Sequence, residues 1–436
     1  NQLSDDQTTS DNVFGNIVPL GSGDMYATFA NSTALEGCKW VNTASAWQDS
    51  LGNSCTTSGT SMTKVEQQIN IIDQEFSTSN ADPAPIDNSL GIIQFDPAKY
   101  NGETVYFEVV GKKDSDTYSR TRSTAVTMPS TAKNFTGQIY NYFTGSANEC
   151  YARLYNISDS SDTTYLIYAT AASITTCYIK SARLIIAQSD ATAITDTETQ
   201  IEVGNNETTT STSYVPLTNK KVYLWDADQY TGTVNVYFEA TLKTSDESPV
   251  NGEAYAALHV NGSSCTSMVT ESAAISSATS WNRYRSSAIS LTDDTAYMVC
   301  IKEYDGDTTS IANAKIIVTQ TQAGGIQNVE VVHQYNNTLV TDADSTYTSQ
   351  DFDNSLTKNN FAGSGYIAYF ESTLKTSDAA GAYYARLDYG GGLGEQTGTD
   401  TSYTRKRSSD LWSSLPASAT DIDVQLKNGS TYTTSS

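Results

Sequence analysis

Short segments of this chain alternate between apolar and polar residues, which is typical of β-strands covered on one face. Residues 150–154, 254–258 and 383–387 share one such pattern, with Ala and Leu on one face and Tyr and Arg on the other. Turns rich in Ser, Thr, Asn, Asp and Gly separate these segments, and no stretch carries a convincing helical period. The pattern predicts an all-β protein made of antiparallel strands.

A Tyr-Phe-Glu triplet recurs along the chain, at residues 106–108, 237–239 and 369–371. The two spacings are 131 and 132 residues, and the residues after the second and third triplets are almost identical. A strand-like opening precedes each triplet, at residues 69–71, 201–203 and 329–331. A closing strand follows the first two, at residues 181–186 and 313–318. A repeat of this length indicates three copies of one domain.

We therefore expect three tandem antiparallel β-sandwich domains, jelly-roll-like, at residues 66–190, 198–322 and 326–436. Residues 1–65 fall outside the copies and are expected to form an extended N-terminal arm or cap. A further motif, aromatic-x-Arg-x-Arg-Ser, recurs at residues 118–123, 281–286 and 403–408. In the first copy it precedes the Tyr-Ala-Arg-Leu strand instead of following it, so that copy is expected to be internally rearranged.

The Tyr-Phe-Glu strand, the Arg-x-Arg-Ser strand and the Ala-Arg-Leu-Ile-Ile closing strand together resemble tandem jelly-roll repeats in large surface proteins of uncultured bacteria. Those repeats are similar to carbohydrate-binding modules. The resemblance covers residues 66–436 and includes no catalytic signature. It implies a location at the cell surface and leaves adhesion and structural roles both open.

The third copy has every segment of the repeat except the closing strand, because the sequence reaches Ser436 first. A sandwich that lacks a strand exposes backbone N–H and C=O groups beside an open strip of core, and these groups invite another strand. We expect this strand to come from the N-terminal arm of another copy. The alternative, given equal weight, is that residues following Ser436 in a longer protein supply it.

Two segments of the arm are candidate donor strands, residues 12–18 and 24–30. The donor candidates within them are Val13, Phe14, Ile17, Val18, Met25, Ala27 and Phe29. Met25, Ala27 and Phe29 share one face of an extended strand, as Ala314, Ile316 and Val318 do in the closing strand of the second copy. Donation from one copy to the next is head-to-tail and does not close on itself, so it predicts a filament.

The composition favours an extracellular protein. Lys and Arg number 25 against 49 Asp and Glu, and the formal charge of −24 disfavours binding to nucleic acid. The polar start at Asn1 suggests a mature exported product, and no apolar run is long enough to predict a membrane span. Six cysteines form close pairs that predict disulfides, with free buried thiols as the alternative. The pairs are Cys38 and Cys55, Cys150 and Cys177, and Cys265 and Cys300.

Candidate chemistry is sparse. The two histidines, His259 and His333, disfavour a His-dependent triad or a multi-His metal centre, and His259 is expected on a solvated face. The repeated carboxylates Glu108, Glu239 and Glu371 are the best candidates for glycoside hydrolysis, but their repetition favours a structural duty. We therefore predict no catalytic residue, no metal site and no cofactor. Asp-rich turns at residues 226–228, 305–307 and 342–344 leave Ca²⁺ as a weaker alternative.

The Arg-x-Arg-Ser strands carry the ligand-binding candidates Trp281, Arg283, Arg285, Tyr403, Arg405 and Arg407. An aromatic ring beside two guanidinium groups can bind a sugar or an anionic polymer. The interpretation we favour is a ladder of cation–π contacts and ion pairs that braces the sheet. Candidate glycosylation sequons begin at Asn31, Asn134, Asn156, Asn206, Asn261, Asn336 and Asn428.

Together these features favour a non-enzymatic structural subunit of an extracellular filament or surface layer, whose partners are copies of itself joined head-to-tail. The alternative is a carbohydrate-binding adhesin, or the binding portion of a larger surface protein, with polysaccharide as its partner.

Overall fold

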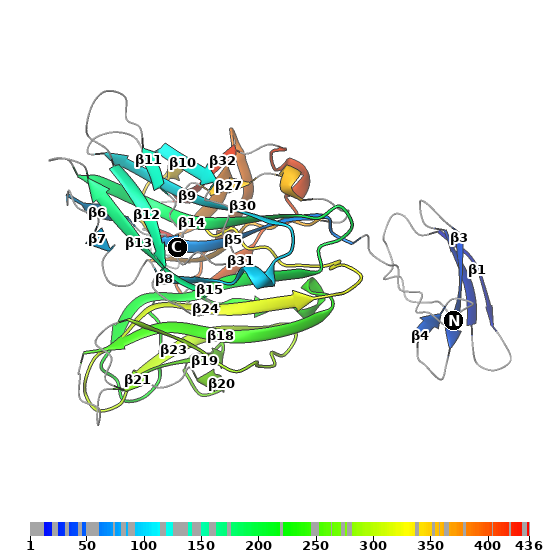
Figure 1. The fold of residues 1–436 in the computed structure, drawn as a ribbon, viewed down its shortest axis with the longest axis horizontal. Helices are drawn as coiled ribbons and strands as arrows, with labels where there is room; N and C mark the ends of the chain where they lie inside the picture. The colour runs from blue at the N-terminus through cyan, green and yellow to red at the C-terminus, as the bar shows by residue number, and fades with distance from the viewer. Residues whose placement is uncertain are drawn as a thin grey trace. The chain divides into compact units, whose positions relative to one another are not determined.

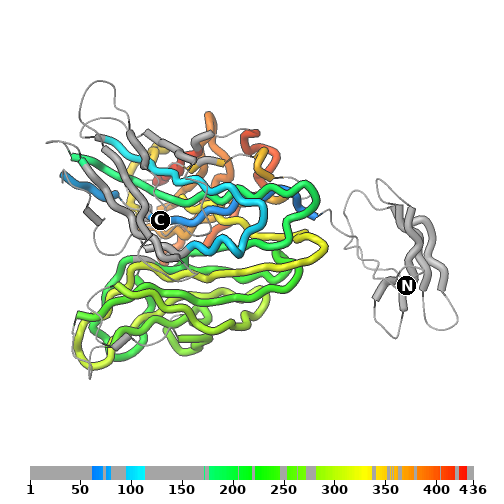
Figure 2. Tube along the Cα trace, in the orientation of Figure 1, coloured from blue at the N-terminus to red at the C-terminus, as the bar shows by residue number. Residues whose placement is uncertain are grey.

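The computed structural model describes four strands within residues 1–60, by their backbone alone, and most of the chain that follows (Figure 2). Side chains are described for most, but not all, of the later residues, and for none in β11 or β12. From residue 61 on, the described residues are 61–72, 75–79, 84–85, 92–113, 119–124, 138–141, 150–156, 163–171, 176–218, 221–245, 253–262, 264–271, 275–276, 281–335, 340–350, 354–356, 358–361, 366–377, 381–402, 404–417, 420–429 and 434–435.

The chain divides into two compact units, Asn1–Thr60 and Ser61–Ser436. The first unit is a four-stranded antiparallel sheet in chain order, so the expectation of an extended arm is wrong. Its strands are β1 (Val13–Pro19), β2 (Met25–Ala30), β3 (Leu35–Val41) and β4 (Ala46–Gln48). The two predicted donor segments coincide with β1 and β2, which pair with each other, Phe14 opposite Phe29. Hydrogen bonding within the unit explains why the segment is not extended.

The second unit is all-β and antiparallel, and each repeat contains two sheets (Figure 1). In the second repeat, one sheet has the order β15-β24-β18-β22 and the other β16-β23-β19-β20, with β17 and β21 beside β23 and β19. The elements are β15 (Asp196–Thr209), β16 (Val215–Pro216), β17 (Tyr223–Trp225), the 3-10 helix η2 (Ala227–Gln229), β18 (Thr233–Thr244), β19 (Glu253–Val260), β20 (Met268–Glu271), β21 (Ile275–Ser276), β22 (Asn282–Arg285), β23 (Thr295–Glu303) and β24 (Thr309–Thr321).

A shared core lies between these two sheets. Phe238 and Ile316 from the first sheet and Leu258 and Val299 from the second belong to one buried cluster, and each is at most 2% exposed. The alternation of side chains along a strand sends every second residue into this core. The apolar positions of the alternating pattern therefore lie in the core, as the sequence predicts.

The first repeat repeats this plan, with sheets β10-β9-β14-β5 and β11-β12-β13-β7. Its elements are β5 (Lys64–Ile72), β6 (Phe76–Thr78), β7 (Ala84–Pro85), β8 (Ile92–Phe95), η1 (Pro97–Lys99), β9 (Glu103–Lys113), β10 (Ser119–Thr124), β11 (Gln138–Asn141), β12 (Cys150–Asn156), β13 (Thr163–Ala171) and β14 (Cys177–Ser189).

The third repeat has the sheets β25-β33-β28-β31 and β26-β32-β29-β30, with β27 beside β32. Its elements are β25 (Thr341–Asp342), β26 (Thr348–Ser349), β27 (Asn354–Leu356), η3 (Lys358–Asn360), β28 (Glu371–Thr376), β29 (Tyr383–Asp388), β30 (Gly392–Gly398), β31 (Thr404–Arg407), η4 (Trp412–Ser414), β32 (Thr420–Asn428) and β33 (Thr434–Ser435).

The Arg-x-Arg-Ser strand takes the same place in space in every repeat, although it comes early in the first copy. It pairs with the Tyr-Phe-Glu strand, as β10 with β9, β22 with β18 and β31 with β28. In each case an arginine stands directly opposite the glutamate of the triplet: Arg122 opposite Glu108, Arg285 opposite Glu239 and Arg407 opposite Glu371. The rearrangement of the first copy changes the connection and keeps the pairing.

The three repeats close into a ring. The backbone N–H of Met62 donates to the carbonyl of Ile326 (2.9 Å), that of Ile326 to Ile194 (2.8 Å), and that of Ile194 back to Met62 (2.7 Å). These residues are spaced 132 apart and, together with Val65, form a buried cluster. The segments that lead into the three repeats therefore meet at an approximate threefold axis. The first repeat contacts the third as well as the second.

Each repeat places one glutamate where it contacts a neighbouring repeat. These glutamates are at positions 66, 198 and 330. The Glu330 carboxylate accepts hydrogen bonds from Tyr223 (2.8 Å) and Tyr230 (2.5 Å) of the second repeat. Glu66 accepts one from Asn360 of the third repeat, and the backbone carbonyl of Glu198 accepts one from Tyr100 of the first (3.1 Å). Burial raises the pKa of Glu330 above 4.5, although the two tyrosines act in the opposite direction.

The raised pKa of Glu330 predicts a pH-dependent stability. The contribution of Glu330 is fully present below its unfolded pKa and is lost as pH rises through its higher folded pKa. The free energy of unfolding of Glu330→Gln minus that of the wild type should therefore increase from pH 4 to pH 8, measured by urea unfolding. Glu330→Ala should cost about 1–3 kcal/mol at pH 4, because two buried hydroxyls lose their acceptor. A pH-independent difference for the Gln variant would contradict this assignment.

Candidate assembly site in the third repeat

The closing strand is an inner strand in the first two repeats. β14 lies between β5 and β9, and β24 lies between β15 and β18. An inner strand hydrogen-bonds along both edges, and it carries the buried residues Leu184 and Ile186 in β14 and Ile316 and Val318 in β24. The closing strand therefore occupies the middle of a sheet, which the sequence alone did not reveal.

In the third repeat only the first two places of the closing strand are filled. Thr434 and Ser435 of β33 pair with Thr376 and Lys375 of β28. Thr309 and Ser310 of β24 pair with the corresponding residues of β18, Thr244 and Lys243. The register of the closing strand is thus set. Beyond β33, the described residues place no strand beside residues 367–373 on the edge opposite β31.

The two segments that flank this gap are less regular than their counterparts. Residues 327–335 form no strand, so the strand expected at residues 329–331 is wrong, whereas β5 and β15 pair along their lengths with β14 and β24. On the other side, β28 begins at Glu371, whereas β18 begins six places earlier in the repeat. A flanking strand needs the inner strand as its partner, which explains both differences.

One edge of residues 367–370 faces the gap. Ala368 and Phe370 use their backbone groups toward the β31 side, where Ala368 accepts from Leu411 (2.7 Å) and Phe370 accepts from Ser408 (2.9 Å). Alternation along an extended chain turns the backbone groups of Ile367 and Tyr369 the other way. The described part of the chain provides these two residues with no backbone hydrogen bond. They form the receiving edge.

Side chains at the gap are uncovered. Ile367 is 60% exposed and Tyr369 47% exposed. The Glu371 side chain is 35% exposed, whereas that of Glu239, at the same position of the second repeat, is 4% exposed. The same residue type in the same motif thus differs in burial because β24 covers one and no described strand covers the other.

The glutamates of the triplet hold the arginines beside them. Arg283 and Arg285 place their Nε atoms 2.7 and 2.9 Å from Glu239 Oε2. Arg405 and Arg407 pair with Glu371 in the same way. Each of these four ligand-binding candidates is therefore paired with the glutamate of the neighbouring strand.

Of the two aromatic ligand-binding candidates, only Trp281 lies within the described residues. Trp281 lies under the Lys243 ammonium, at 4.6 Å from the ring centre, and Tyr403 lies outside the described residues. Arg285 and Arg407 stack over Tyr237 and Tyr369 at 5.5 and 4.9 Å. The arrangement is a cation–π and ion-pair ladder in both repeats.

His259 departs from the expectation of a solvated face. It is 1% exposed on β19, packs against Tyr214 with ring centres 5.3 Å apart, and burial lowers its pKa. The Tyr214 ring covers the imidazole, a contact that the sequence pattern did not indicate.

Several other predicted sites are settled only in part. Cys265 and Cys300 form a disulfide, and Cys177 is disulfide-bonded. The side chains of Cys38, Cys55 and Cys150 lie outside the description. Among the sequons, Asn206 and Asn261 are exposed, whereas Asn428 is fully buried and so is not open to glycosylation in the folded chain. Asn31, Asn134, Asn156 and Asn336 have no described side chain.

Two of the Asp-rich turns use an aspartate side chain to accept a backbone hydrogen bond within the turn. Asp226 caps η2 by accepting from the N–H of Asp228, and Asp342 accepts from Asp344. Within the described ranges no three His, Cys, Asp or Glu side chains cluster as metal ligands. In the same ranges no helix has the length and apolar character needed to cross a membrane.

Comparison with known proteins adds little. No protein-family model and no curated protein matches this chain. Among solved structures it is similar to the dimeric latent PorU from Porphyromonas gingivalis, at 8% sequence identity and a TM-score of 0.24. The match covers 84% of this chain and 33% of that one, so this chain spans about a third of that structure. A likeness this weak supports no conclusion about fold or function.

The unequal burial of Glu239 and Glu371 predicts unequal costs for one substitution. Glu239→Gln leaves Arg283 and Arg285 without a buried carboxylate and should lower the free energy of unfolding by about 3 kcal/mol. Glu371→Gln, at the open site, should cost less than about 1 kcal/mol in the unassembled protein. Urea unfolding of both variants checks the contrast. Equal costs would show that the third repeat is as covered as the second.

Proposed function

We propose that this chain is a non-enzymatic structural subunit of an extracellular filament or surface layer. In this proposal the three repeats are jelly-roll-like sandwiches, and a strand from the N-terminal unit of one copy completes the third repeat of the next. The observation that carries the proposal is the receiving edge at Ile367 and Tyr369, beside a gap where the other two repeats have an inner strand.

The N-terminal unit is a reasonable donor because it is separate. Residues 1–60 make their own sheet, and the strand pairs of that sheet all lie within the unit. β1 is an edge strand of that sheet and is held by its pairing with β2 alone. Donor and acceptor belong to different parts of the chain, and such an interface is head-to-tail and propagates into a filament.

An extracellular location accords with the chemistry of the chain. The disulfide between Cys265 and Cys300 is of the kind that persists in oxidising compartments. The formal charge of −24 favours solubility. The alternative, a carbohydrate-binding module, has less support, because the arginines on which it depends are already paired with Glu239 and Glu371.

Deleting the N-terminal unit tests the proposal. The full chain should form filaments or large assemblies in negative-stain electron micrographs and in size-exclusion chromatography, and a variant lacking residues 1–60 should elute as a monomer. Ile367→Pro in the full chain should have the same effect, because proline removes an N–H from the receiving edge. The melting temperature of each variant, measured below the assembly concentration, controls for folding of the repeats.

Three outcomes separate the parts of the proposal. A full chain that stays monomeric at high concentration contradicts it. Assembly that survives the deletion but is lost in Ile367→Pro means that some other segment, such as one following residue 436, fills the gap. Assembly that survives both changes removes the third repeat from the interface.

A further inference from the structure

Three polar residues of β15 and β24 lie together on the face of their sheet that does not enter the core. Gln200 and Glu202 alternate with the core residue Ile201 along β15, and Lys315 of β24 stands opposite Glu202 in the ladder. Gln200 is thus the diagonal neighbour of Lys315, within reach of a long side chain. Lys315 is 3% exposed and Gln200 7% exposed, so the pair is shielded from bulk water.

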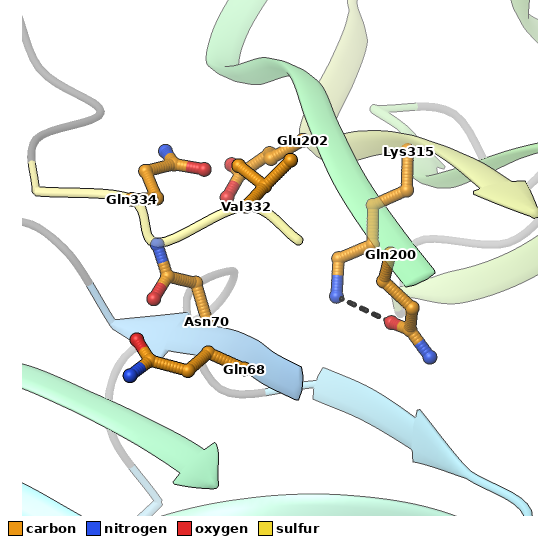
Figure 3. A pocket seen from close by; sticks show the side chains of 7 residues that line it. All are labelled: Gln68, Asn70, Gln200, Glu202, Lys315, Val332 and Gln334. Atoms are coloured by element: carbon orange, nitrogen blue, oxygen red, sulfur yellow. Dashed lines mark hydrogen bonds between the residues drawn. The ribbon is translucent and has the colours of Figure 1, made fainter. Parts of the chain in front are cut away.

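The Lys315 side chain contacts the carboxamide of Gln200 (Figure 3). Its Nζ donates a hydrogen bond to Gln200 Oε1 (3.2 Å), and both side chains line a polar cavity with residues from all three repeats. Within the described residues Nζ makes no ion pair. Glu239, which stands opposite Lys315 on β18, instead pairs with Arg283 and Arg285. The other residues that line the cavity are Gln68, Asn70, Glu202, Val332 and Gln334.

A buried lysine without a counter-ion favours its neutral form. Burial lowers the pKa of Lys315 below 10.5, although Glu202 and Glu239 act in the opposite direction. A neutral amine has a free lone pair and is a nucleophile, whereas an ammonium ion is not. The hydrogen-bonded contact is close to the separation of about 3–3.5 Å at which near-attack conformers hold reacting atoms. Lys315 is therefore placed to attack the Cδ atom of Gln200.

Glu198 lies at the other end of the same carboxamide. Its Oε1 accepts a hydrogen bond from Gln200 Nε2 (2.8 Å), and the residue is 2% exposed. Burial raises the pKa of Glu198 above 4.5, although Arg285 acts in the opposite direction. A carboxyl group kept protonated by burial can act as a general acid. The amide nitrogen leaves only after it gains a proton, and Glu198 is the proton donor beside it.

The first repeat carries the same amide and acid but no amine. Its Gln68 Nε2 donates a hydrogen bond to Glu66 Oε1 (3.2 Å), as in the second repeat. Arg183 takes the place of the lysine, with its Nε 3.8 Å from Glu108 Oε1. A guanidinium group stays charged and is not a nucleophile. In the third repeat Val332 stands at the place of the glutamine. The set of amine, amide and acid is therefore complete in the second repeat.

We propose that Lys315 and Gln200 form an intramolecular isopeptide bond that joins β24 to β15. The neutral Nζ attacks Cδ, so that the Nζ–Cδ bond forms and the Cδ–Nε2 bond breaks. Glu198 gives its proton to Nε2 and takes one from Nζ, and one ammonia leaves. The reaction needs no cofactor and no outside reactant. The bond links positions 115 residues apart and is independent of the proposed strand exchange.

The intact mass of the folded full chain gives the first test. Mass spectrometry should find the chain lighter than its sequence, after allowance for disulfides, by one ammonia, which is about 17 Da. Lys315→Arg, which introduces the residue type of the first repeat, and Lys315→Met should both abolish this loss. Lys302→Arg, on β23, is the control and should keep it.

Two results of this measurement overturn the proposal. One is a mass equal to that of the sequence with its disulfides. The other is a loss of ammonia that survives Lys315→Arg, because the ammonia then comes from another place, such as a succinimide at an Asn-Gly sequence.

Peptide mapping gives the second test. Trypsin digestion of the denatured and reduced chain should yield one branched peptide that contains both Gln200 and Lys315, because the bond blocks cleavage after this lysine. Tandem mass spectrometry locates the junction. Separate peptides for the two residues, with cleavage after Lys315, would contradict the proposal.

The variant Glu198→Gln tests the acid. It keeps the size of the side chain and removes the proton donor, so the joined form should accumulate at least tenfold more slowly after cell-free synthesis, as followed by intact mass. Circular dichroism of the variant controls for folding. An unchanged rate in a folded variant would overturn the role of Glu198.

Discussion

The hydrogen-bonding demand of an inner β-strand is the constraint on which this structure depends. A strand at the centre of a sheet satisfies two neighbours at once, and without it both neighbours lose their partner. β14 and β24 meet this demand in the first two repeats, and their flanking strands are long and regular. In the third repeat β33 meets it for two residues, and the flanking segments lose strand geometry over the remaining length.

The ring brings the sheets of the three repeats together around one axis. The opening segments of the three repeats meet through Met62, Ile194 and Ile326, and they line a shared polar cavity at the axis. The closing strand of the second repeat contributes Lys315 to that cavity. A strand that completes the third repeat would therefore also complete the surroundings of the axis.

Much of the fold could be predicted from the sequence, because short-range alternation and a long exact spacing are both visible in it. The Tyr-Phe-Glu spacing located the repeats, and the alternation located strands such as β19, although it wrongly predicted a strand at residues 329–331 and a solvated His259. The inner position of the closing strand could not be predicted, since alternation does not reveal which strands are neighbours. The ring was also missed. The matching spacing of Glu66, Glu198 and Glu330 was the available signal, but an equal spacing in the sequence does not show that the repeats contact one another.

The receiving edge of the third repeat can be observed directly by amide hydrogen exchange, resolved to single residues, on the unassembled and the assembled protein. The account predicts that the amides of Ile367 and Tyr369 exchange at rates close to those of an unfolded chain before assembly, while those of Asn235 and Tyr237 in the second repeat are protected. Assembly should bring the first pair to the protection of the second. Strong protection of Ile367 and Tyr369 in the unassembled chain would contradict the account.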